Sequence, residues 1–183
     1  MTASERELSI EKYFAEHLCR ATRKAHLPVP RETIARFRNA FILLPSETAD
    51  LFLSGSIDLT VMIETDPALP LGMRTTCEGP PYSRRYMIVV YEEHLQWAED
   101  LFIGSFLREL AHAVAGQPPE DEWPTSRSER ARFKEMLEHQ ADAVVWKWGL
   151  KEYSMRHITA TYPAHRVEII VAEIERIVKE GPV

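Results

Sequence analysis

The feature that most constrains the fold is an apolar helical stretch from Leu101 to Gly116, LFIGSFLRELAHAVAG. Large apolar side chains recur on every side of this stretch, and such a helix is expected in the interior of a domain. Three polar residues, Arg108, Glu109 and His112, interrupt it. Residues four apart lie one above the other on a helix, so Arg108 and His112 share a face, with Glu109 beside them. The rest of the chain must therefore supply partners for these side chains.

Length and composition indicate an ordinary globular chain. The sequence has 183 residues, of which 45% are apolar and 27% charged, which suits a single domain over residues 1–183. The two cysteines, Cys19 and Cys77, are far apart and in no Cys-x-x-Cys arrangement, so neither a disulfide framework nor a thiolate metal site is indicated.

Charge and hydropathy narrow the classes of partner. A formal net charge of -6 gives no reason to expect a nucleic-acid partner, because such proteins usually carry a clustered basic face. The first residues, MTASERELSI, are polar where a signal peptide would be apolar, and no later run approaches the roughly 18 apolar residues of a membrane span. We therefore expect no membrane partner and a cytoplasmic location.

The first half of the chain predicts helices followed by a small sheet. An apolar stripe predicts an N-terminal helix at about 5–26, and a second helix is expected from Arg31 to about Ala40. Alternation and β-branched residues then predict strands at 57–63, 73–77 and 86–91, with turns at 66–67 and 70–72. We expect these strands to form a mainly antiparallel sheet.

The second half predicts helices only. Ser126 and Glu129 have the spacing of a capping box, and they open a helix that carries Glu138 and Asp142 beside its apolar face. A final helix is expected at about 163–180, with an apolar stripe typical of a packing element. The predicted fold class is α+β, a small sheet packed with several helices that include the buried one.

Two short motifs resemble those of the zincin metallopeptidases. The segment RELAH resembles the zinc-helix motif His-Glu-x-x-His, except that Arg108 stands at the first histidine position. The segment EHQADAVVWKWG is similar to the glutamate helix of gluzincin-type peptidases, where a Glu-x-x-Ala-Asp motif follows the zinc helix, and Glu138, Ala141 and Asp142 match it. Together the motifs define a core of about 86–150, and the resemblance implies a minimal zincin-like domain.

The resemblance also implies roles for individual residues. His112 would be the second zinc histidine, Glu138 the third ligand, Glu109 the general base that activates a zinc-bound water, and Asp142 a supporting residue. Arg108 cannot replace a histidine ligand, because a guanidinium stays protonated and offers no lone pair. A catalytic zinc site normally has three protein ligands, and this motif leaves two.

We therefore expect an ion-pair network of Arg108, Glu109, Glu138 and Asp142 in place of a metal cofactor. The corresponding function is a non-catalytic zincin homologue whose cleft binds a protein or peptide. The strand that ends near Tyr91 is expected to border this cleft and to pair with extended peptides.

Three alternatives remain open at this point. The chain is a working zinc metallopeptidase with an unusual ligand set if it recruits His94 or His139 as the missing ligand. RELAH is a chance match if its polar side chains simply reach solvent. Glu109 and His112 also have the Glu-x-x-His spacing of di-iron helix bundles, with Glu135 and Glu138 as further carboxylates, although a strand-rich middle does not fit a bundle. Four residues after the glutamate helix are candidate hydrogen-bond donors to a substrate: Tyr153, His157, Tyr162 and His165.

Overall fold

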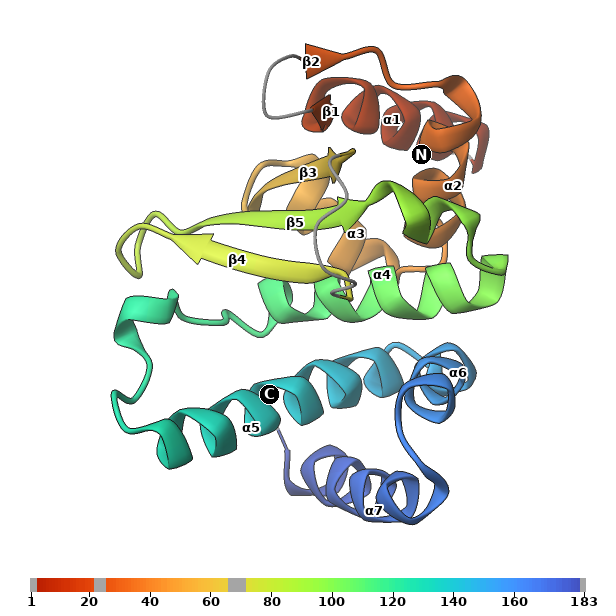
Figure 1. Ribbon diagram of the computed structural model, residues 1–183. Helices are drawn as coiled ribbons and strands as arrows, with labels where there is room; N and C mark the ends of the chain where they lie inside the picture. Colours follow the sequence, from red (N-terminus) through yellow and green to blue (C-terminus); the bar gives the residue numbers. More distant parts are fainter. Residues whose placement is uncertain (1–2, 22–25, 66–71, 182–183) are drawn as a thin grey trace.

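The computed structural model describes residues 3–21, 26–65 and 72–181 (Figure 1). Its sheet has five strands, in the spatial order β2, β1, β3, β5, β4. The strands are β1 (Leu18–Ala21), β2 (His26–Leu27), β3 (Asp58–Glu64), β4 (Arg74–Glu78) and β5 (Arg85–Tyr91). β4 is therefore one edge of the sheet, and β5 lies inside it.

The described helices lie on two sides of one central helix. They are α1 (Ala3–His17), α2 (Arg31–Phe41), α3 (Ser46–Leu53), α4 (Glu99–Val114), α5 (Arg127–Lys147), α6 (Lys151–Thr161) and α7 (Ala164–Glu180), with short 3-10 helices at Glu92–Gln96 and Glu120–Glu122. Figure 1 shows α4 running between the sheet with α1, α2 and α3 above it and the group of α5, α6 and α7 below it. The α+β class predicted from the sequence is confirmed.

Most of the predicted elements are present, but the N-terminal helix is shorter than expected. α1 ends at His17, and Leu18–Ala21 forms a strand, so the prediction of a helix to residue 26 is wrong beyond His17; residues 22–25 lie outside the described residues. Leu18 continues the helical stripe in sequence, but it pairs with Val61 of β3, and this tertiary pairing overrides the local helical pattern.

The sheet is mixed, which corrects the expectation that it would be mainly antiparallel. β1 pairs with β3 and β3 with β5 in parallel, whereas β2 and β4 pair antiparallel with β1 and β5. Parallel neighbours need a long crossover, and α2 and α3 supply one between β1 and β3. β5 is buried without interruption from Ile88 to Tyr91, as a central strand requires, while β4 exposes Arg74 and Glu78.

Two clusters of buried apolar side chains hold the helices and the sheet together. The larger cluster joins the sheet to α1–α4 and to one face of α5. The smaller one consists of Ala143, Ile158, Ile170 and Ile174, from α5, α6 and α7. α4 is buried from Phe102 to Ala113, as its sequence predicts. Among the described residues, no helix has the length and apolar character needed to cross a lipid bilayer.

Candidate functional site

α4 places the three polar residues of the RELAH segment in the interior. Arg108 is 7% exposed, Glu109 5% and His112 4%. α5 packs against α4 and brings Glu138 and Asp142 to the same place. This helix begins where the sequence predicts, because the Ser126 hydroxyl accepts the backbone N–H of Glu129 at its first turn. The two motifs, 26 residues apart between His112 and Glu138, thus meet in space.

The guanidinium of Arg108 lies between the two carboxylates of α5. Its Nη2 forms an ion pair with Glu138, and its Nε donates a hydrogen bond to Asp142 Oδ2 at 3.2 Å. Burial opposes the charge on Glu138, but Arg108 and His112 outweigh it and lower the pKa of Glu138 to about 2. Burial also opposes the charge on Arg108, and Asp142 and Glu138 outweigh it, so the pKa of Arg108 is raised. The cation and Glu138 are therefore both ionised at neutral pH.

Asp142 has a second partner on α6. The Ser154 hydroxyl, which is fully buried, donates to Asp142 Oδ1 at 2.9 Å and accepts the indole N–H of Trp146 at 3.1 Å. A chain of hydrogen bonds therefore runs from Trp146 through Ser154 and Asp142 to Arg108. The local sequence gives no sign of Ser154, because only the packing of α6 on α5 brings it to Asp142.

Glu109 takes a different partner from the one expected. The Thr75 hydroxyl of β4 lies 2.8 Å from Glu109 Oε2 and 2.9 Å from the Glu109 carbonyl oxygen. No ion pair within 4.0 Å joins Glu109 to Arg108 in the described part of the chain. Burial raises the pKa of Glu109, while His112 and Arg108 act in the opposite direction. Glu109 is therefore a buried carboxyl bound to the edge strand, outside the Arg108–Glu138–Asp142 network.

His112 shares Glu138 with Arg108. Its Nε2 lies 3.3 Å from Glu138 Oε2, so the two side chains that the zincin resemblance names as ligands do converge. They amount to two of the three protein ligands of a catalytic zinc site, and a guanidinium lies against one of them. Within the described residues, no three His, Cys, Asp or Glu side chains are grouped closely enough to hold a metal ion. This side-chain set does not fit a catalytic zinc ion.

The structure brings neither candidate replacement ligand to His112. His94 lies in the 3-10 helix between β5 and α4, where its Nδ1 accepts the N–H of Tyr91, and it does not line the hollow that contains His112. His139 lies next to Glu138 on α5 but lines a different part of the surface from His112. Glu135, which the di-iron alternative requires, is held by Arg166 of α7.

Ser105 and His157 form a further polar pair beside this network. The Ser105 hydroxyl lies 2.8 Å from Nδ1 of His157 on α6. Burial and the positive charge of Arg108 lower the pKa of His157 to about 3, so its ring is neutral at physiological pH. Of the four candidate donors expected after the glutamate helix, His157 and Tyr162 line the surface beside Arg108, and Tyr153 and His165 do not.

Two adjoining hollows, of about 270 and 480 Å³, open over this network, and together they form what we call the cleft. Arg108, Glu109, Lys134 and Glu138 line both hollows, with Thr75 on the side of β4 in one and Tyr162 on the side of α6 in the other. The strand that borders the cleft is β4, because β5 is covered on both sides by β3 and β4. The expectation that the strand ending near Tyr91 would border it is therefore wrong.

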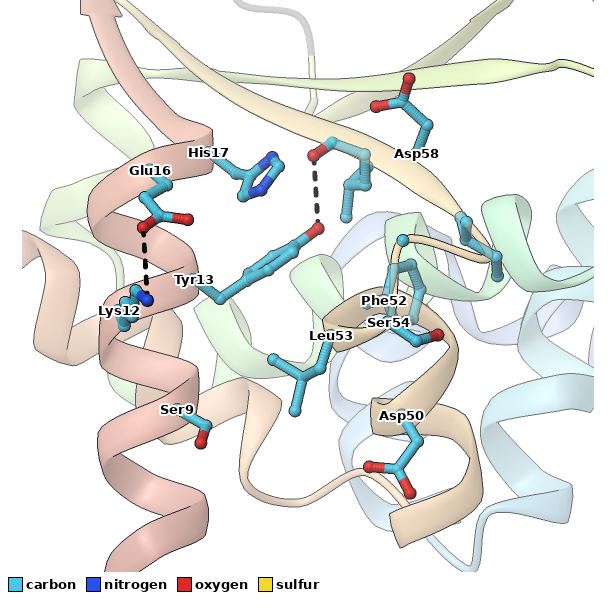
Figure 2. Close-up of a pocket in the computed structure, with 13 residues that line it drawn as sticks. Ser9, Lys12, Tyr13, Glu16, His17, Asp50, Phe52, Leu53, Ser54 and Asp58 are labelled. Carbon is cyan, nitrogen blue, oxygen red and sulfur yellow. Dashed lines mark hydrogen bonds and ion pairs between the residues drawn. The ribbon is translucent and has the colours of Figure 1, made fainter.

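A larger hollow, of about 730 Å³, lies elsewhere, between α1 and the segment that joins α3 to β3. Figure 2 shows Tyr13 reaching across it to donate to the Leu59 carbonyl at 3.3 Å, with the Lys12–Glu16 pair on its rim. None of the motif residues lines this hollow. Size alone therefore does not single out a functional site. The shifted pKa values of Arg108, Glu138 and His157 point to the smaller cleft as the candidate.

Compared with known proteins, the chain matches no family model, no curated protein and no solved structure.

Proposed function

We propose that this protein is a non-catalytic, zincin-like domain whose cleft binds a peptide or an extended segment of a protein without a metal ion. The observation that carries the proposal is the position of Arg108, whose guanidinium contacts Glu138 and Asp142 between the two motif helices. A cation fixed there repels a divalent metal, and without a metal the site lacks the Lewis acid by which a zincin lowers the pKa of its attacking water.

The shape of the cleft supports an extended ligand. β4 is an edge strand, and its residues 74–76 line the hollow beside Glu109. An edge strand presents backbone N–H and C=O groups that an incoming strand can pair with. The Gln117 amide already donates to the Thr75 carbonyl at 3.4 Å, which shows that this carbonyl accepts a hydrogen bond from outside the sheet.

Metal content and hydrolysis test the proposal directly. Protein purified without chelator should contain less than stoichiometric zinc, and it should not cleave a mixed peptide substrate when zinc is added. Acetylated and amidated hexapeptides should slow hydrogen exchange of the β4 amides relative to those of β3. Stoichiometric zinc with peptide cleavage would instead establish the alternative, an active zinc metallopeptidase with an unusual ligand set.

A further inference from the structure

Arg108 keeps one edge of its guanidinium free. Nε donates to Asp142 and Nη2 forms an ion pair with Glu138, whereas Nη1 makes no hydrogen bond among the described residues. Arg108 is 7% exposed, and Nη1 is not among the side-chain nitrogens that are both fully buried and without a hydrogen bond. Because Arg108 lines both hollows of the cleft, the two N–H groups of Nη1 are the guanidinium donors left for a ligand that lies there.

Glu109 presents an acceptor next to this donor. Its Oε2 accepts the Thr75 hydroxyl, while Oε1 has no hydrogen-bond partner in the described part of the chain. Glu109 is 5% exposed and lines the same two hollows as Arg108. The floor of the cleft thus offers two N–H donors and one carboxylate acceptor from consecutive residues of α4.

The charge balance decides which ligand group fits. Glu138 and Asp142 already compensate the guanidinium, and the Glu109 carboxyl is close by. A ligand carboxylate at Nη1 would be a fourth acidic group around the buried Arg108 cation, after Glu109, Glu138 and Asp142. Like charges repel strongly where solvent is excluded. Lys134 also lines the cleft, but its ammonium is exposed and therefore screened. A neutral amide accepts from Nη1 without this repulsion, and a neighbouring N–H can donate to Glu109.

We infer that Arg108 and Glu109 form a receptor for the uncharged backbone of an internal peptide segment, with a peptide carbonyl on Arg108 Nη1 and a peptide N–H on Glu109 Oε1. This inference rests on the proposed function, since it names the ligand group that the cleft binds. It also distinguishes the site from a receptor for free C-terminal carboxylates.

Nuclear magnetic resonance of protein with ¹⁵N-labelled arginine side chains tests the inference. The probe is a library of acetylated, amidated hexapeptides with a Thr-Val frame and two varied central positions. Two comparison ligands carry a free carboxylate. One is the same set of peptides shortened to end at the first varied position with a free C-terminus, and the other is sodium acetate. We expect the blocked library to shift the Arg108 guanidinium resonances saturably. The free carboxylates and acetate should bind at least about tenfold more weakly. Repulsion between the ligand carboxylate and the neighbouring acidic side chains cancels the gain from its hydrogen bond to Arg108.

Arg108→Lys supplies the matched substitution, because lysine keeps a cation for Glu138 and Asp142 but loses the Nη1 edge. Its affinity for the blocked library should fall by about 10- to 100-fold. Arg85→Lys is the control, because Arg85 is an exposed side chain that lines neither hollow of the cleft, and its substitution should leave the affinity unchanged. The wild-type guanidinium spectrum does not depend on whether the Arg108 variant folds.

The outcomes separate the inference from the proposed function. Shifts confined to the β4 amides, with no change at Arg108, would overturn the inference and leave peptide binding in place. Tighter binding of acetate or of free carboxylates than of the blocked library would overturn it as well. If no peptide binds anywhere in the cleft, both the inference and the proposed function are wrong.

Discussion

At the scale of single residues, arginine at position 108 in place of histidine is what separates this site from a zinc site. Histidine and arginine both reach into the cleft from position 108, but only histidine has a lone pair for a metal. His112 and Glu138 already lie 3.3 Å apart, and positions 108 and 112 share a helix face. The remaining side chains are thus arranged so that a third ligand would complete the set.

Arg108→His should therefore create a zinc site. Loss of a residue that only supports a zinc ligand lowers the zinc affinity by about 10- to 100-fold, and a direct ligand contributes at least as much. The variant should therefore bind zinc at least about tenfold more tightly than the wild type does. Competition with a zinc-binding dye measures the affinity. The double variant Arg108→His, Glu138→Gln is the control, and it should lose the gain; equal affinity in both variants would argue against the convergence of these residues on a metal position.

His157 should control part of the stability at acidic pH. Its pKa falls from a usual 6.5 to about 3 on folding, so the stability it contributes is present above pH 6.5 and is lost as the pH falls toward 3. Between pH 6.5 and 4.5 the free energy of unfolding should drop by about 2–3 kcal/mol from this residue. Urea denaturation at each pH measures the drop.

The variant His157→Gln isolates this contribution, because glutamine does not titrate. Glu109, whose pKa burial raises, contributes a change of the opposite sign in both proteins, so the difference between them belongs to His157. Identical pH dependence in the two proteins would show that His157 is not held neutral by its surroundings.

How far the site could be predicted from the sequence also depends on single residues. RELAH and the Glu138–Asp142 spacing indicate Arg108, His112 and both carboxylates, because each motif has a fixed helical spacing. Thr75 and Ser154 carry no such signal, since each reaches the site from another element through the packing of β4 and α6. Glu109 was expected to join the ion pairs, but its direct partner is Thr75.

At the scale of elements, the sequence predicts those that have a clear period. The helices at 31–41 and 164–180 and the strands at 58–64, 74–78 and 85–91 follow from their apolar patterns. β1 has only four residues, too few to show a period of two, and it continues the stripe of α1. α3 and α6 have 8 and 11 residues, and their apolar side chains form a less one-sided stripe than those of α2.

The crossing of α4 and α6 depends on the absence of a side chain at Gly104. A Cβ added there would lie 2.3 Å from the Tyr153 carbonyl oxygen, which is backbone and cannot move aside. Gly104→Ala should therefore destabilise the protein by about 1–3 kcal/mol, less about 1 kcal/mol that alanine gains in helix propensity. Thermal unfolding monitors the change.

Gly72→Ala is the matched control for this substitution, because nothing lies within 4 Å of the added atom and its φ is not left-handed. It should leave the midpoint of unfolding nearly unchanged. An equal midpoint for both variants would mean that α4 and α6 are not as closely packed as the structure shows.

At the scale of the whole molecule, the two apolar clusters differ in extent. The cluster of α5–α7 has four buried members, whereas the other joins the sheet to α1–α4 and to one face of α5. Regions with few buried contacts open at lower free energy than the rest of a protein. The cleft lies where the two clusters meet, so the stability of its α5 and α6 side depends on the smaller cluster.

Native-state hydrogen exchange should reveal this difference. Amides of α7 should exchange through an opening of lower free energy than those of β3 and β5. Ile174→Ala should speed exchange in α6 and α7, at a cost of about 2–5 kcal/mol to that opening, and change β5 less. A uniform effect on all amides would show that the two clusters unfold as one unit.

The hydrogen-bond chain from Trp146 to Arg108 connects an indole ring outside the cleft to the guanidinium within it. Trp146 is half-buried, the Lys151 ammonium lies 3.9 Å from its ring centre, and its N–H is the first link of the chain. A ligand that binds the Arg108 guanidinium should change the electrostatic field at Asp142. The Ser154 hydroxyl then passes this change to the hydrogen bond of the Trp146 indole. Hydrogen bonds thus connect an intrinsic fluorophore to Arg108 in the proposed binding cleft, and the difference in emission between wild type and Trp146→Phe should report on ligands there without any added label.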